Sequence, residues 1–104
     1  MQLNFLSRLF GVSKPDFKEL VKNGAFLLDV RTTGEFSRGH VPGAKNIPMD
    51  QLRSKISSLP KDKVIICYCA SGVRSASAKG VLMAKGFKEV YNGGGCSALM
   101  RKLS

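Results

Sequence analysis

The sequence predicts an α/β domain built on a mostly parallel central sheet with helices on both faces. Short apolar runs with strand character alternate along the chain with stretches whose apolar residues recur at helical spacing. A chain of 104 residues is long enough for one domain and too short for two. Strands that alternate with helices favour parallel pairing, because a parallel connection needs a crossover of helical length.

Residues that favour helix ends delimit three predicted helices. The residues Ser-Lys-Pro-Asp at 13–16 indicate the start of the first, and Gly24 ends it. Asp50 is expected to cap the second helix, which Pro60 stops. The third is expected over 75–85, in the alanine-rich stretch before a glycine.

Three apolar runs predict strands, at 25–30 (AFLLDV), 64–68 (VIICY) and 89–91 (EVY). The first two are short and mostly apolar, which is typical of strands buried on both faces. Polar residues follow both of them: Asp29 and Arg31 close the first run, and the segment 69–74 follows the second. In open parallel sheets, sites form beyond the carboxyl ends of the strands. We therefore expect a site at this edge.

The segment after the second strand, Cys69-Ala70-Ser71-Gly72-Val73-Arg74-Ser75, has the composition of an anion-binding loop. Small side chains and a glycine let successive N–H groups point inward, and the next helix directs its N-terminus at the same point. A thiol in that setting is stabilised as the thiolate. We predict that Cys69 is a nucleophile; the alternative is a small buried apolar residue.

Four segments in order along the chain resemble the single-domain rhodanese family, the thiosulfate sulfurtransferase-like domains. They are LLDVR (27–31), EFSRGHVPGAKNIP (35–48), CASGVRS (69–75) and VYNGGG (90–95). The resemblance starts near Ser13, so we expect a rhodanese-like three-layer domain over 13–104, preceded by an amphipathic lead-in segment over 1–12. The family often has a tryptophan after the double glycine, where this chain has Leu99.

The resemblance implies a role for each matching residue. Cys69 corresponds to the residue that becomes a persulfide, and Arg74 to a basic residue that contacts the anion. Asp29 and Arg31 correspond to residues that brace the site. The remaining loop residues correspond to those whose backbone N–H groups hold the transferred sulfur: Ala70, Ser71, Gly72, Val73 and Ser75.

The implied function is transfer of a sulfane sulfur from thiosulfate or another small anionic donor to a thiol or cyanide, with no cofactor and no metal. One alternative is a sulfur-carrier or relay module that receives sulfur from a partner protein. Another is a phosphatase or arsenate reductase of the same fold. Those phosphatases have five residues between cysteine and arginine, whereas four separate Cys69 from Arg74 here. The shorter loop favours sulfur transfer.

The net charge of +10 predicts attraction to anions, either a small substrate or an acidic sulfur-relay protein. No aromatic residues are interleaved with the basic ones, so the sequence does not predict nucleic-acid binding. No apolar run approaches the roughly 20 residues of a membrane span, and we expect no membrane partner. Three cysteines leave at least one free thiol, which favours a cytoplasmic location.

Three other residues of reactive type are expected to be structural. His40 lies in a predicted turn, and Cys67 lies within the second strand. Cys96 is expected to pack in the core, with a role as a resolving thiol for Cys69 as the alternative. The cysteines and His40 lack the paired Cys-x-x-Cys spacing typical of zinc sites.

Overall fold

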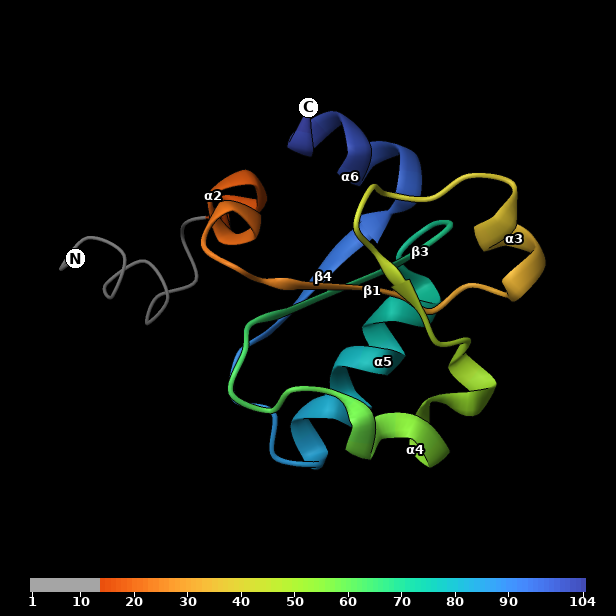
Figure 1. Ribbon diagram of the computed structural model, residues 1–104, viewed down its shortest axis with the longest axis vertical. Helices are drawn as coiled ribbons and strands as arrows, with labels where there is room; N and C mark the ends of the chain where they lie inside the picture. Colours follow the sequence, from red (N-terminus) through yellow and green to blue (C-terminus); the bar gives the residue numbers. More distant parts are fainter. Residues whose placement is uncertain (1–13) are drawn as a thin grey trace, which may run out of the picture.

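The computed structural model describes residues 14–104, and within them four parallel strands form one sheet (Figure 1). The strands are β1 (Phe26–Asp29), β2 (Lys45–Asn46), β3 (Ile65–Cys69) and β4 (Val90–Gly95), and their order in the sheet is β2-β1-β3-β4. All three strand pairs are parallel. The predicted parallel sheet is confirmed.

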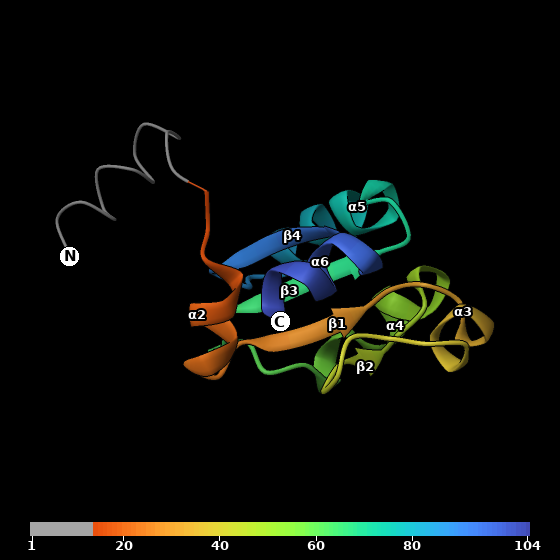
Figure 2. The ribbon, with the colours of Figure 1, turned by 90° about the horizontal axis from the view of Figure 1, so that it is seen from above.

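Helices cover both faces of this sheet, as the sequence predicts (Figures 1 and 2). Helices α2 (Phe17–Lys22) and α6 (Cys96–Leu103) pack on one face, and α4 (Leu52–Lys55) and α5 (Val73–Ala84) pack on the other. The short α3 (Thr33–Ser37) follows β1 and lies beyond the carboxyl end of that strand. The described residues therefore form three layers.

Strand β3 lies between β1 and β4, and all five of its residues are buried. Its side chains alternate between two apolar clusters because successive residues of a strand point to opposite faces. Ile65, Cys67 and Cys69 join the cluster beneath α5, and Ile66 and Tyr68 join the cluster beneath α6. This alternation directs the Cys69 side chain toward α5.

Several boundaries differ from those predicted. The predicted cap at Asp50 is wrong: this residue lies inside a 3₁₀ turn, Met49–Gln51, and the helix that follows has no side-chain cap. That helix, α4, is only one turn long and runs into a second 3₁₀ turn. Strand β4 continues four residues past Tyr91, because glycines let it run close beside β3.

The first helix starts as expected, with the Asp16 Oδ1 accepting a hydrogen bond of 3.1 Å from the Glu19 backbone N–H. The proposed start signal at Ser13 and the lead-in segment 1–12 lie outside the described residues. The two-residue strand β2 and the helix α3 have no counterpart in the prediction. No helix within 14–104 combines the length and apolar character needed to cross a lipid bilayer.

Glycines at the end of β4 allow close packing that any side chain would disturb. A Cβ on Gly95 would lie 2.5 Å from the backbone oxygen of Ala70, and a Cβ on Gly93 would lie 3.0 Å from side-chain atoms of Ile66 and Leu99. The loop after Cys69 and the helix α6 therefore rest directly on the β4 backbone. This contact determines how close the loop lies to the sheet.

We predict that Gly95→Ala lowers the free energy of unfolding by roughly 1–3 kcal/mol, because the new methyl group overpacks the contact with Ala70. Gly80→Ala is the matched control, because Gly80 lies on the exposed side of α5 and a Cβ there would meet nothing within 4 Å. That change should stabilise the chain by about 0.5–1 kcal/mol through helix propensity. Urea unfolding of both variants measures the difference, and equal effects would contradict the packing argument.

Candidate active site

Cys69 is the last residue of β3, at the carboxyl edge of the sheet, and its side chain has no solvent-exposed area. The loop 70–72 turns over it, and α5 begins at Val73, two residues earlier than predicted. The first turn of α5 therefore covers the thiol. The exposed side of this loop consists of Ala70, Ser71 and Val73.

Hydrogen-bond donors from the loop converge on the Cys69 sulfur. The Gly72 backbone N–H donates to Sγ over 3.0 Å, and the Ser75 hydroxyl donates over 3.5 Å. The backbone N–H groups of Ser71 and Ser75 also lie near enough to this sulfur to lower its pKa. The thiol thus lies in a cup of polar hydrogens, although its other neighbours are apolar.

These donors determine the ionisation of Cys69. Burial acts to raise the pKa of the thiol, but the hydrogen bonds from Ser75, Ser71 and Gly72 outweigh it and lower the pKa to about 7. Each bond is stronger to a thiolate than to a thiol, so each favours the charged form. A large fraction of Cys69 is therefore thiolate at neutral pH, which is the nucleophilic form.

Gly72 makes the tight turn possible. Its φ of 101° lies in the left-handed region, which favours glycine. A Cβ on Gly72 would also lie 3.2 Å from the Gly94 Cα, so the loop contacts β4 backbone to backbone. This conformation turns the Gly72 N–H inward to Sγ.

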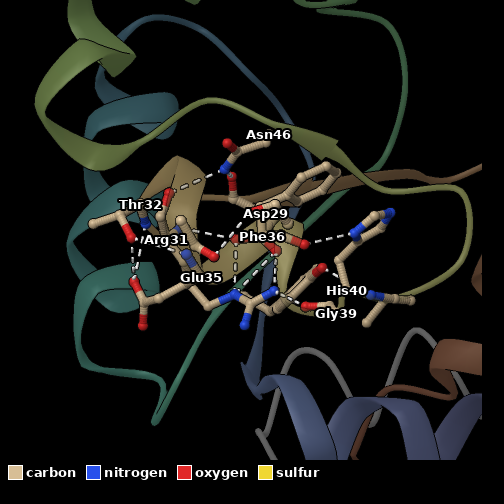
Figure 3. Close-up of polar contacts among 12 residues, drawn as sticks. Asp29, Arg31, Thr32, Glu35, Phe36, Gly39, His40 and Asn46 are labelled. Atoms are coloured by element: carbon tan, nitrogen blue, oxygen red, sulfur yellow. Dashed lines mark hydrogen bonds and ion pairs between the residues drawn. The ribbon is translucent and has the colours of Figure 1, made fainter.

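Arg74 pairs with a carboxylate that the sequence analysis missed. Its guanidinium makes two bonds to Glu35 of α3, at 2.8 and 3.0 Å, and Glu35 and Cys69 both raise the pKa of Arg74. The pair holds the pKa of Glu35 near 2, with a further contribution from the Thr32 backbone. The Thr-x-x-Glu spacing of a capping box was the available signal, because the box fixes Glu35 at the start of α3 (Figure 3).

Asp29 and Arg31, at the end of β1, bond to each other (Figure 3). Asp29 is fully buried, and its carboxylate accepts bonds from the Arg31 backbone N–H, Nε and Nη2, the last over 2.7 Å. The same Nη2 donates to the Gly39 carbonyl over 2.7 Å, so the pair ties the end of β1 to the segment after α3. The pKa of Arg31 is raised by this bond to Asp29.

Tyr68 and Asn46 extend this brace. The Tyr68 hydroxyl accepts a 3.0 Å bond from the Val41 N–H, and the Arg31 guanidinium lies over the Tyr68 ring at 5.6 Å. The Asn46 Nδ2 donates to the backbone oxygens of Asp29 and Arg31 (Figure 3). These bonds hold the end of β1 in place beside the end of β3.

The other residues of reactive type, Cys67, Cys96 and His40, each make structural contacts of their own. Burial raises the pKa of Cys67 to about 12, and its Sγ is held between the carbonyl oxygens of Ser75 and Tyr91. Cys96 belongs to the cluster on the opposite face of the sheet from Cys69, which disfavours a disulfide between them. His40 is exposed, bonded to the Phe36 carbonyl and stacked on the Phe36 ring.

Comparison with known protein families identifies the family of this chain. Residues 13–101 match the Rhodanese-like domain family. The chain belongs to this family. Within residues 14–104, no three histidine, cysteine or acidic side chains are grouped so that they could hold a metal ion.

Individual rhodanese relatives support this assignment. The chain is 43% identical over 68 residues to the uncharacterized protein YqhL of Bacillus subtilis. This match covers 65% of this chain and 54% of YqhL. It is 32% identical over 87 residues to the thiosulfate sulfurtransferase GlpE of Ectopseudomonas mendocina, covering 84% and 80%. The chain thus spans little more than half of the first relative and four fifths of the second.

A solved structure, that of a human single-domain sulfurtransferase, has the same fold. It matches with a TM-score of 0.71 at 28% identity, and the match covers 89% of this chain and 96% of the human one. The predicted rhodanese-like fold is confirmed.

We predict that alkylation of Cys69 by iodoacetamide rises with pH to a plateau with a midpoint near 7, because the hydrogen bonds lower its pKa to about that value. Reactivity is lost as the pH falls below 7 and the thiolate takes up a proton. Cys67, with a pKa of about 12, stays unmodified over the same range. Peptide-level mass spectrometry distinguishes the two residues. A midpoint near 9, the ordinary thiol value, would show that the donors do not act on the sulfur.

Proposed function

We propose that this chain is a sulfurtransferase that moves a sulfane sulfur from thiosulfate, or a similar small anionic donor, to a thiol or cyanide through a persulfide on Cys69. The observation that carries the proposal is the ionisable thiol beneath the Gly72 N–H and the Ser75 hydroxyl. The thiosulfate sulfurtransferase name of the GlpE relative supports the same chemistry.

The reaction proceeds in two half-steps. In the first, the Cys69 thiolate attacks the outer sulfur of thiosulfate, a new S–S bond forms, and the old S–S bond breaks with its electron pair leaving on sulfite. Sulfite is a stable anion, so this step needs no general acid. In the second, the acceptor attacks the outer sulfur of the persulfide and forms a bond to it. The S–S bond between that sulfur and Cys69 breaks, and its electron pair returns to Cys69, which leaves the thiolate.

The loop suits an anionic sulfur better than a neutral one. The N–H groups of Ser71, Gly72 and Ser75 are preorganised donors, which stabilise negative charge without reorienting during the reaction. Ala70 and Val73 contribute small or exposed side chains that leave the backbone close to the sulfur. In this proposal the loop 70–75 holds the persulfide as it holds the thiolate.

Arg74 supplies the cation for the sulfonate end of the donor. Its guanidinium bonds to Glu35, its pKa is also raised by the nearby Cys69, and its side chain is 38% exposed. Glu35 holds the guanidinium over the loop and also neutralises part of its charge. A dianionic donor therefore shares Arg74 with Glu35. Asp29 and Arg31 neutralise each other and act as support at the end of β1.

We predict that thiosulfate adds the mass of one sulfur atom to the wild-type chain and none to Cys69→Ser, as measured by intact-protein mass spectrometry. Arg74→Ala should still take up sulfur, but the thiosulfate concentration for half conversion should rise roughly tenfold, because a charge-assisted bond to the donor is lost. Cys96→Ser is the matched cysteine control and should behave as wild type.

An unmodified wild-type chain would contradict the proposed donor. If the chain takes sulfur from a protein persulfide but not from thiosulfate, the relay module is favoured over a thiosulfate-using enzyme. Sulfur that appears equally on Cys69→Ser would rule out the proposed mechanism.

A further inference from the structure

Asn92 of β4 bonds to the active-site loop through every polar atom of its side chain. Its Nδ2 donates to the Gly72 carbonyl over 3.0 Å. Its Oδ1 accepts a 2.7 Å bond from the Ser75 hydroxyl and a 2.9 Å bond from the Gly94 N–H. The carboxamide therefore joins the loop, the first turn of α5 and the end of β4.

Strand alternation directs this side chain toward α5, because Val90, two residues before it, lies in the cluster beneath that helix, and an irregularity in β4 follows directly after Asn92. Asn92 pairs with Cys67 and Gly94 pairs with Tyr68, so Gly93 is an extra residue in the strand. This is a β-bulge, which redirects side chains at the edges of sites. Gly93 packs against Ile66 and Leu99 on the α6 side, whereas the Asn92 side chain contacts α5.

Two routes connect Asn92 to the Cys69 sulfur. In the first, Asn92 holds the carbonyl of the Gly72 residue, whose N–H donates to Sγ over 3.0 Å. Gly72 has no side chain and a left-handed φ, so this bond restrains a residue with wide backbone freedom. The second acts in the opposite sense, because Asn92 Oδ1 at 2.7 Å competes with Sγ at 3.5 Å for the single proton of the Ser75 hydroxyl.

We propose that Asn92 is a positioning residue that holds the Gly72 N–H on the Cys69 sulfur, and so stabilises the thiolate and the persulfide of the proposed sulfur transfer. The part that concerns the persulfide rests on the proposed function. The part that concerns the thiolate rests on the geometry of the loop.

The effect of Asn92 on the Cys69 thiolate can be distinguished from the effect of nearby charges, because the charged and titratable groups near Cys69 belong to other residues. Arg74 of α5 interacts electrostatically with Cys69 and is paired with Glu35 of α3, and Cys67 of β3 lies on the same face of the sheet as Cys69. On β1, the carboxylate of Asp29 is bonded to Arg31. Asn92 is uncharged. Its removal therefore leaves the charges in place and changes only the hydrogen bonds.

The test is the alkylation pKa of Cys69 in Asn92→Ala. Loss of one positioned bond to the thiolate should raise this pKa by about one unit and lower reactivity at pH 7 roughly fivefold, with recovery at high pH. Asn46→Ala is the matched control, because Asn46 also bonds two backbone carbonyls but contacts β1 and not the loop. Its thermal stability should fall while its thiol pKa stays at the wild-type value.

Asn92→Asp is the second variant, for the case in which the alanine variant does not fold. It keeps an acceptor for Ser75, loses the Nδ2 donor and adds negative charge, so its thiol pKa should rise further. A wild-type pKa in a folded Asn92 variant would overturn the proposal. Alkylation does not require sulfur transfer, so a wild-type chain that takes no sulfur would overturn the proposed function and leave the thiolate role of Asn92 standing.

Discussion

The hydrogen bond from the Gly72 N–H to the Cys69 sulfur is the interaction on which the rest of the site depends. It exists because β3 ends at a cysteine, Gly72 adopts a left-handed φ, and α5 starts at the next residue. The glycines of β4 let the loop lie against the sheet without side chains between them. Burial raises the pKa of Cys69 and favours the protonated thiol. The hydrogen-bond donors beside the sulfur outweigh burial and lower this pKa.

Two ion pairs lie at the carboxyl edge of the sheet and differ in what they can do. Asp29 and Arg31 are buried, bonded to each other and tied to backbone groups, so they fix the end of β1. Glu35 and Arg74 are half-exposed and bridge α3 and α5 across the loop. The buried pair is suited to support, whereas the exposed guanidinium remains able to meet an anion. The full cover over Cys69 also means that a donor reaches the sulfur only as the loop residues adjust.

The sequence predicted those features that depend on local pattern. The apolar run at 25–30 contains β1, the run at 64–68 covers all of β3 but its last residue, and in the segment 69–75 the Gly72 N–H and the Ser75 hydroxyl donate to the Cys69 sulfur. Asp50 failed as a cap because a 3₁₀ turn begins before it. The partners Glu35 and Asn92 were missed because they lie 39 residues from Arg74 and 17 residues from Ser75. Such pairs arise from packing of α3 and β4 against α5, which periodicity does not reveal.

The most direct test of this account follows the Gly72 amide itself. In a ¹⁵N-labelled chain, the Gly72 amide resonance should move downfield as the pH rises, with a midpoint near 7, because its N–H gains a charged acceptor when Cys69 ionises. The resonance should not titrate in Cys69→Ser. A Gly72 amide that is insensitive to pH in the wild-type chain would contradict the account, because it would show that this N–H does not hold the thiolate.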